Sequence, residues 1–427
     1  MLKIDNIVEQ GKYFRLAGPV FLFIMAFSGV FARGIVNIAA ALLIIWAIIL
    51  YYFRSFFHAN RIPPLPRGLF YGFAIYFAIL ILTSLLGENI PRSLMYVGVT
   101  FYVLLVFPAT CLAISQMPES SVRILPYCYG AGILVASFIT FQEAHFTLSC
   151  TRAPAHMGII PLSVVLSQLS PMMVAALAVF GRDNKKSAIF FLLVLLGAYV
   201  ALRNNCTRMA LLVVPVLGIM MFFAFRKYFG KVLTLIFVLV LLICSVTILM
   251  DKKIIDRFKP MFDTSGTVAS NEVRYTRWKN GIEVWKENPV FGVGPISILN
   301  VPCMKIAVEE RDCENQPEYY HSHQLFITIL AESGVLGLIG FLLLHIVPLW
   351  YLWPGLKMDD ALVRFWCWCS LAVFLQLFLN GLTDYVFSTK AVLYIYWTTT
   401  ATAFCVLTRK NKELLAKPIP LKPRNFA

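Results

Sequence analysis

The sequence predicts an all-α polytopic membrane protein, because composition, charge and hydropathy patterning all lead to this class. The chain has 427 residues, of which 59% are hydrophobic and 14% are charged. Its mean hydropathy is +0.76, whereas a soluble chain of this length would carry roughly a quarter charged residues. A bilayer core about 30 Å thick needs on the order of 20 apolar residues per helix, and the chain offers about a dozen such runs.

The apolar runs predict about 12 transmembrane helices. They are expected at 16–32, 35–53, 69–86, 94–115, 122–141, 160–180, 187–202, 208–225, 231–250, 324–353, 361–381 and 390–408. The first run follows a polar, basic start with Lys3, Lys12 and Arg15, and no small-residue cleavage site follows it. We therefore expect a retained first span and not a signal peptide.

The distribution of Lys and Arg predicts the orientation in the membrane. If the N-terminus is cytoplasmic, most of these residues fall in cytoplasmic segments and few fall in the short outer loops. The outer ones are Arg33, Arg92, Arg152, Arg203, Arg208 and Lys390. The positive-inside rule then places both termini in the cytoplasm. We therefore attribute the net charge of +15 to membrane topology and not to nucleic-acid binding. The alternative is that the basic tail binds anionic lipid.

One long segment, from Asp251 to Ser322, lacks a membrane-length apolar run. Loops of this length are uncommon unless they are functional, and the predicted topology puts this one on the periplasmic side. The predicted organisation has four parts. They are helices 1–9 in residues 1–250, a large periplasmic loop domain in 251–322, helices 10–12 in 323–408, and a basic cytoplasmic tail in 409–427.

The loop domain is expected to contain an interfacial helix. Asn271 can cap it, Trp278 and Trp285 recur at helical spacing, and Asn288-Pro289 ends it. Such a helix suits the headgroup layer. Its Arg274 can meet a phosphate there or can serve as a snorkelling anchor. The Gly292-Val-Gly294-Pro295 segment follows this helix. It superficially resembles a dinucleotide-binding motif, but no strand precedes it, so it predicts a tight turn.

The ten cysteines are scattered, and most lie in apolar spans as small buried residues. Cys303 and Cys313 share the outer loop, where a disulfide would persist. Their pairing stays open, with Cys150 and Cys206 as competing partners. No cofactor is predicted, and no zinc site, because Cys150 with His145 or His156 lacks a familiar ligand spacing.

The outer face carries few charged or titratable residues, and these are the candidates for chemistry. They are Arg203, Arg208, Arg274, Arg277, His321, His323, Asp384 and Lys390. Guanidinium groups match phosphate oxygens bidentately, and histidine can accept a proton near neutral pH. This combination fits the transfer of a group from a lipid-linked pyrophosphate to an acceptor hydroxyl. A metal-dependent reaction would need an outer-face carboxylate cluster, but Asp359-Asp360 lies on the cytoplasmic side and Glu309-Glu310 lacks a clear partner, which favours a metal-independent reaction. Each residue taken alone is more often an interfacial anchor than a functional group.

Three stretches resemble one known family. "HQLFITILAESGVLG" fits H-[N/S/Q]-x9-G-x-x-G with His323, Gln324, Gly334 and Gly337 in the fixed places. "TRMALL" at 207–212 and "VRYTRWKNGIEVWKENPVFGVGP" at 273–295 are similar to the other motifs of the same family. The family is that of the O-antigen ligases, related to O-antigen polymerases and bacterial O-linked oligosaccharyltransferases. The likeness covers residues 200–340.

The resemblance implies a type C glycosyltransferase-like enzyme of the inner membrane that is inverting and metal-independent. It would transfer O-polysaccharide from undecaprenyl pyrophosphate to a hydroxyl of lipid A-core at the outer leaflet. Matched position by position, Arg208 and Arg274 would bind the pyrophosphate and His323 would be the base. Arg203 and Arg277 are further candidates for substrate binding. His321 would be a helper at most, because residues two apart on a helix point to different sides.

Gly334 and Gly337, with Gly340 one turn on, are expected to share one face of span ten. Small residues allow close helix approach, which would hold the start of this span and its His323 in place. The alternatives are a polymerase or protein oligosaccharyltransferase with a different acceptor, and a transporter or flippase of the lipid-linked sugar. The chain shows no internal symmetry of the kind common in transporters.

Overall fold

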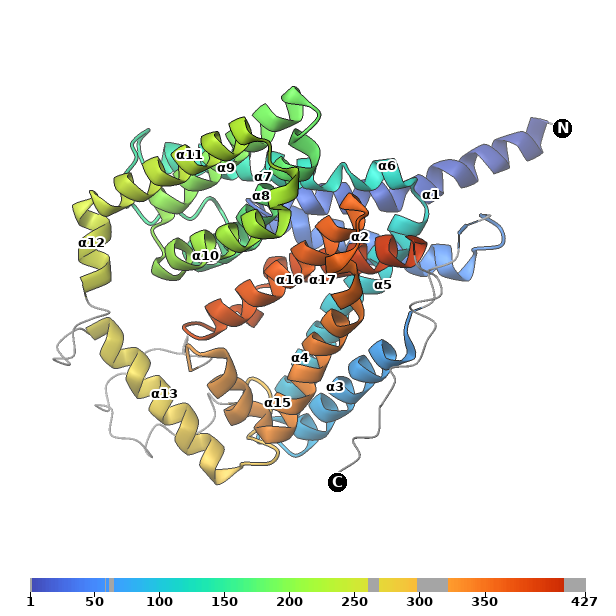
Figure 1. Ribbon diagram of the computed structural model, residues 1–427. Helices are drawn as coiled ribbons and strands as arrows, with labels where there is room; N and C mark the ends of the chain where they lie inside the picture. Colours follow the sequence, from blue (N-terminus) through green and yellow to red (C-terminus); the bar gives the residue numbers. More distant parts are fainter. Residues whose placement is uncertain (1, 58, 61–64, 260–268, 298–321, 411–427) are drawn as a thin grey trace, which may run out of the picture.

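The computed structural model describes residues 2–57, 59–60, 65–259, 269–297 and 322–410, and every regular element that these residues form is a helix (Figure 1). The α-helices are α1 (Leu2–Ser28), α2 (Arg33–Tyr52), α3 (Arg67–Leu85), α4 (Ile90–Leu104), α5 (Val106–Ser115), α6 (Glu119–Val122), α7 (Leu125–Glu143), α8 (Ile159–Gly181), α9 (Lys185–Asn205), α10 (Arg208–Phe225), α11 (Lys231–Leu249), α12 (Lys252–Phe258), α13 (Ala269–Glu287), α15 (Leu325–Leu352), α16 (Ala361–Gly381) and α17 (Lys390–Lys410). The predicted all-α membrane class is confirmed.

Eleven helical segments of the described chain are long and apolar enough to cross a membrane. The first predicted span corresponds to α1, whose apolar part, Tyr13–Ser28, is shorter than these. Two predicted spans consist of two helices each: α4 with α5, and α6 with α7. The order and the approximate positions of the predicted spans agree with the structure.

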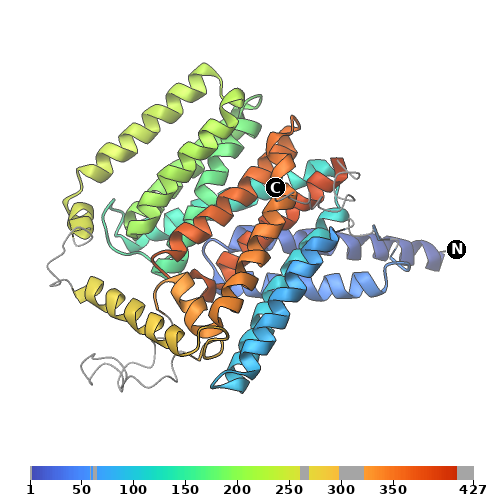
Figure 2. The same cartoon turned by 60° about the horizontal axis from the view of Figure 1, so that its bottom comes forward.

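Two helices form the centre of the bundle. The membrane-length window of α17 is completely buried and that of α8 is 94% buried, whereas only 6% of α11 is buried. Figures 1 and 2 show α11 at the edge of the molecule, beside α9 and α10. The other helices therefore pack around α8 and α17, and α11 presents most of its surface outward.

Contacts between loops and helix ends show which segments lie together at each end of the bundle. At one end, the amide of Glu88 donates to the carbonyl of Val293 (2.9 Å). At the other end, Lys410 forms ion pairs with Glu119 (3.3 Å) and Asp360 (3.4 Å). The sequence placed the first pair on the outer side and the second group on the inner side, so the predicted alternation agrees with these contacts. We call the two ends outer and inner accordingly, and the orientation in a membrane stays a prediction.

Helix α15 is broken at Gly334, which has φ +64° and ψ −166°. The expectation that Gly334, Gly337 and Gly340 share one helix face is therefore wrong. Gly334 faces the backbone of Val290, Gly340 packs against Tyr76 of α3, and a side chain on Gly337 would meet Ser333 of its own helix. Because the break interrupts the helical geometry of α15 at Gly334, this residue does not share a face with the glycines that follow it.

The segment that fills the break is Asn288–Ser297, "NPVFGVGPIS", which we call the clamp segment. Four backbone hydrogen bonds join it to the two halves of α15: Val293 N to Ala331 O (3.0 Å), Gly294 N to Glu332 O (2.8 Å), Val335 N to Pro289 O (2.9 Å) and Leu336 N to Val290 O (3.3 Å). These are the carbonyls and amides that the break withdraws from the helix. The predicted tight turn is thus part of a larger structure that completes a broken membrane helix.

Helix α13 ends at Glu287, directly before the predicted stop at Asn288-Pro289. It begins at Ala269, so Asn271 lies inside the helix and the predicted cap position is wrong. Figures 1 and 2 show α13 running across the outer ends of the bundle. Its predicted place in the headgroup layer stays a prediction.

We expect the Gly334→Ala variant to lose about 1–3 kcal/mol of stability, because any L residue is strained at this backbone conformation. An added Cβ would also meet the carbonyl of Val290. The measurement is the apparent thermal unfolding midpoint in detergent. Gly98→Ala is the matched control, since a Cβ there meets nothing within 4 Å. Equal midpoints for the two variants would contradict the assigned role of Gly334.

Candidate active site at the outer helix ends

His323 lies immediately before α15 and not within it. Gln324 is the N-cap of this helix and accepts an amide hydrogen bond from its first turn. The amide of Ser322 donates to Oγ1 of Thr328 (3.1 Å), and His323 has a positive φ of 51°. The backbone therefore turns sharply at His323. Because His323 precedes the helix, the expectation that helical spacing points His321 and His323 to different sides does not apply to it. His321 lies outside the described residues.

His323 forms a pair with Asp384, which follows α16. Its Nδ1 lies 3.3 Å from Oδ1 of Asp384, and the two side chains are 25% and 15% exposed. The same carboxylate oxygen accepts the amide of Tyr385 (2.8 Å). When Nδ1 donates its proton to Asp384, Nε2 carries the lone pair. The arrangement thus suits a histidine that acts as a base through Nε2.

Tyr385 stabilises the turn that carries Asp384. Its hydroxyl lies 3.0 Å from that of Tyr96 on α4. Burial raises the pKa of Tyr385 well above its ordinary value, so the phenol stays neutral and acts as a hydrogen-bonding anchor. The sequence identified Asp384 as an outer-face charge but gave it no role. Its only signal was its position as the carboxylate of the last outer turn.

The arginine-bearing face of α13 packs against the start of α15. A Cβ on Gly281 would lie 3.2 Å from Cβ of Ser322, the residue before His323. Arg277 precedes Gly281 by one helical turn and Arg274 by about two turns, so all three lie on one side of the helix. Both arginines are partly buried. Arg274 and Arg277 therefore lie on the side of α13 that packs against the start of α15, next to His323.

Arg208 begins α10, directly after the turn "NNCT" at 204–207. The disulfide between Cys150 and Cys206 joins this turn to the outer loop after α7. The side chain of Asn205 donates to the carbonyls of Ala153 (3.1 Å) and Ile159 (2.9 Å). These bonds fix the position from which α10 and its Arg208 start.

Arg208 and Asp384 lie at the same level of the bundle. At the inner end, Arg364 of α16 donates to the carbonyl of Ala224 in α10 (2.9 Å), and the two helices pack together. From there the helices extend outward by similar lengths, about 24 Å to Arg208 and about 26 Å to Gly381. The outer ends of α10 and α16 therefore lie at about the same level along the bundle.

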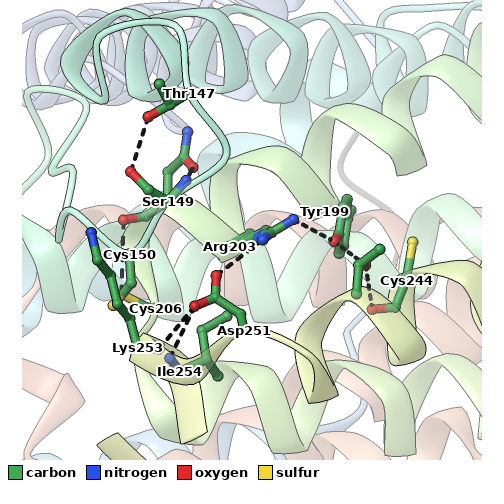
Figure 3. Close-up of polar contacts among 12 residues, drawn as sticks. Thr147, Ser149, Cys150, Tyr199, Arg203, Cys206, Cys244, Asp251, Lys253 and Ile254 are labelled. Carbon is green, nitrogen blue, oxygen red and sulfur yellow. Dashed lines mark hydrogen bonds and ion pairs between the residues drawn. A yellow bond between two sulfur atoms is a disulfide. The ribbon is translucent and has the colours of Figure 1, made fainter. Parts of the chain in front are cut away.

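Arg203 is engaged with a carboxylate instead of facing an open site. Its Nη2 lies 3.0 Å from Oδ2 of Asp251, and the two side chains are 15% and 11% exposed. Nη1 also contacts the hydroxyl of Tyr199 (3.4 Å). Figure 3 shows Arg203 between these two partners, close to the disulfide. This ion pair joins the end of α9 to the start of α12, and the binding role predicted for Arg203 stays a prediction.

The disulfide resolves part of the cysteine prediction. The two competing partners, Cys150 and Cys206, bond to each other with a Cα–Cα distance of 5.5 Å. Cys303 and Cys313 lie outside the described residues. Within the described ranges, no group of three or more His, Cys, Asp and Glu side chains could hold a metal ion.

Comparison with known proteins agrees with the resemblance inferred from the motifs. Residues 189–342 match the family model described as O-antigen ligase. No curated protein matches the chain. The matched range contains Arg203, Arg208, both arginines of α13, the clamp segment and His323, whereas Asp384 lies beyond it. Over residues 189–342, the chain is therefore similar to the O-antigen ligases.

Proposed function

We propose that this protein is an O-antigen ligase that transfers O-polysaccharide from undecaprenyl pyrophosphate to a hydroxyl of lipid A-core. The observation that carries the proposal is the His323–Asp384 pair at 3.3 Å, which lies next to the arginine-bearing face of α13. His323 falls within the range that matches the family model, and Asp384 falls after it. Both substrates are amphiphilic. A site at the outer ends of membrane helices lets each lipid stay in the leaflet while the sugar and phosphate groups react.

In the proposed reaction, Nε2 of His323 accepts the proton of the acceptor hydroxyl. The acceptor oxygen then attacks the anomeric carbon of the donor sugar, and the bond from that carbon to the pyrophosphate oxygen breaks. A single displacement inverts the anomeric configuration. Asp384 holds the imidazole orientation and stabilises the imidazolium that forms, as an anion does beside any cation in a partly buried site.

Undecaprenyl pyrophosphate leaves with the bonding electron pair, and its negative charge needs cations nearby. Arg208 and Arg274 are proposed to bind it, with Arg277 as a further contact. The first turn of α10 adds to this, because helix N-termini attract phosphates and Thr207 caps none of its amides with its side chain. The proposal retains the metal-independent reaction expected from the resemblance.

The disulfide supports the proposed orientation. Disulfides form and persist in oxidising compartments such as the periplasm, and Cys150–Cys206 lies at the end of the bundle that carries His323. We therefore propose a multi-pass protein of the bacterial inner membrane with its site facing the periplasm and both termini in the cytoplasm.

The function is tested by lipopolysaccharide gels of a deletion strain complemented with variants. Wild type should restore polymer on core, and His323→Asn should leave bare core with accumulated lipid-linked polymer, since loss of a general base costs about 100- to 10,000-fold in rate. His145→Asn is the matched control because both histidines have a positive φ, which Asn tolerates. Core capped by a single repeat in the deletion strain would indicate a polymerase, and transfer by His323→Asn would reject the base.

Asp384→Asn should lower kcat about 100-fold in purified enzyme, because the imidazole loses its fixed orientation. The acceptor and donor KM values should change little, since the proposed contacts to both substrates remain. Asp359→Asn is the control, as this carboxylate lies at the inner end, where it pairs with Lys227. An unchanged kcat for Asp384→Asn would show that the pair has no part in catalysis.

Arg208→Gln and Arg274→Gln should each raise the donor KM or lower kcat/KM for the donor at least about 10-fold, because a charge-assisted contact to phosphate is lost. Lys279→Gln is the control on α13, where the side chain is exposed. Donor titrations in nanodiscs measure the effect. Wild-type donor kinetics in both arginine variants would make them lipid anchors only.

A further inference from the structure

Glu332 is a buried carboxylic acid that the proposed mechanism does not use. It lies in the last turn of α15 before the break at Gly334, and it is 4% exposed. Ionisable residues inside membrane helices are rare and costly and usually have a specific role. In the sequence it is visible only as a single acidic residue in the apolar run 324–353.

Glu332 contacts the clamp segment through both its backbone and its side chain. Its carbonyl accepts the amide of Gly294 (2.8 Å), and its carboxyl group lies close to the amide of Ile296 and to Arg92. The adjoining cavity is lined by Glu332 together with Pro295 of the clamp segment and Tyr385. Glu332 is thus next to two residues of the clamp segment, with a backbone hydrogen bond to one and its side chain beside the amide of the other.

The clamp segment needs such support because part of its backbone is strained. Ile296 has a positive φ of 57°, a conformation that is an outlier for a β-branched residue and is strained. A hydrogen bond from its amide to the adjacent side chain of Glu332 would offset this strain. The adjacent bond from Ser93 Oγ to the carbonyl of Pro295 (2.8 Å) holds the other side of the same turn.

The position of the clamp segment determines the position of α13. The segment follows α13 directly, and Val284 of α13, Val293 of the segment and Ala331 of α15 form one small buried cluster. If the segment moved, the helix that bears Arg274 and Arg277 would shift relative to the start of α15. Displacements of about 1 Å can cost an enzyme roughly 100-fold in rate.

We propose that Glu332 is a positioning residue: it holds the clamp segment in the break of α15 and thereby fixes α13 over His323. The catalytic consequence rests on the proposed ligase function, whereas the structural consequence does not. The carboxylate acts by accepting a hydrogen bond, so glutamine, which keeps an acceptor oxygen, should replace it and alanine should not.

Hydrogen exchange measured by mass spectrometry tests the structural part on the full chain in nanodiscs. In Glu332→Ala, amides of 288–297 and of 274–287 should exchange at least about 10-fold faster, because a buried hydrogen bond is lost. Glu332→Gln should exchange as wild type does. Glu143→Ala is the matched control, since that carboxylate accepts the amide of Ala155 in a different outer loop (2.9 Å). Unchanged exchange in Glu332→Ala would overturn the proposal.

Transfer kinetics test the catalytic part. Glu332→Ala should lower kcat per folded enzyme about 10- to 100-fold, and Glu332→Gln should recover it. A purely structural role would reduce the folded fraction but leave kcat per folded enzyme unchanged, and that result would overturn the positioning role. If wild type itself transfers no polymer, the ligase proposal fails, and the exchange data still decide whether Glu332 holds α13.

Discussion

The break in α15 is the constraint on which the outer end of this structure depends. Inside a membrane protein, a helix can be interrupted only where other protein groups satisfy the freed carbonyls and amides. Here the partners are the amides of Val293 and Gly294 and the carbonyls of Pro289 and Val290. The clamp segment therefore cannot leave without exposing unpaired backbone at membrane depth. For this reason a loop outside the spans becomes as firmly placed as a transmembrane helix.

This constraint explains how the proposed site can be assembled from elements that are distant in sequence. His323 comes from the start of α15, Asp384 from the turn after α16, and the arginines from α10 and α13. Each element is fastened separately: α10 by the disulfide at Cys206, and α13 by the clamp segment. Fixed positions matter for the proposed reaction, because transfer between two lipid-anchored substrates would require correct orientation of both reacting groups.

The sequence predicted the fold class and the helix order well, because apolar runs of membrane length leave few alternatives. The motif also singled out His323, whose catalytic role stays a prediction. The sequence could not predict the break, because glycine in an apolar run is equally consistent with close helix packing. It could not pair His323 with Asp384 or Arg203 with Asp251 either. Those contacts connect residues 61 and 48 positions apart, and no local spacing reports such distances.

The spacing of the family motif acquires a physical meaning from these contacts. Nine residues, Leu325–Ser333, separate the cap at Gln324 from the break at Gly334, which is about two and a half turns or roughly 14 Å of helix. Adding or removing one residue would rotate the cap by about 100° relative to the clamp segment. His323 would then point away from Asp384 although every side chain of the site was still present. The motif thus specifies the angle between the bonded break at Gly334 and the side chain proposed as the base, so the glycine contributes to the geometry of the proposed site.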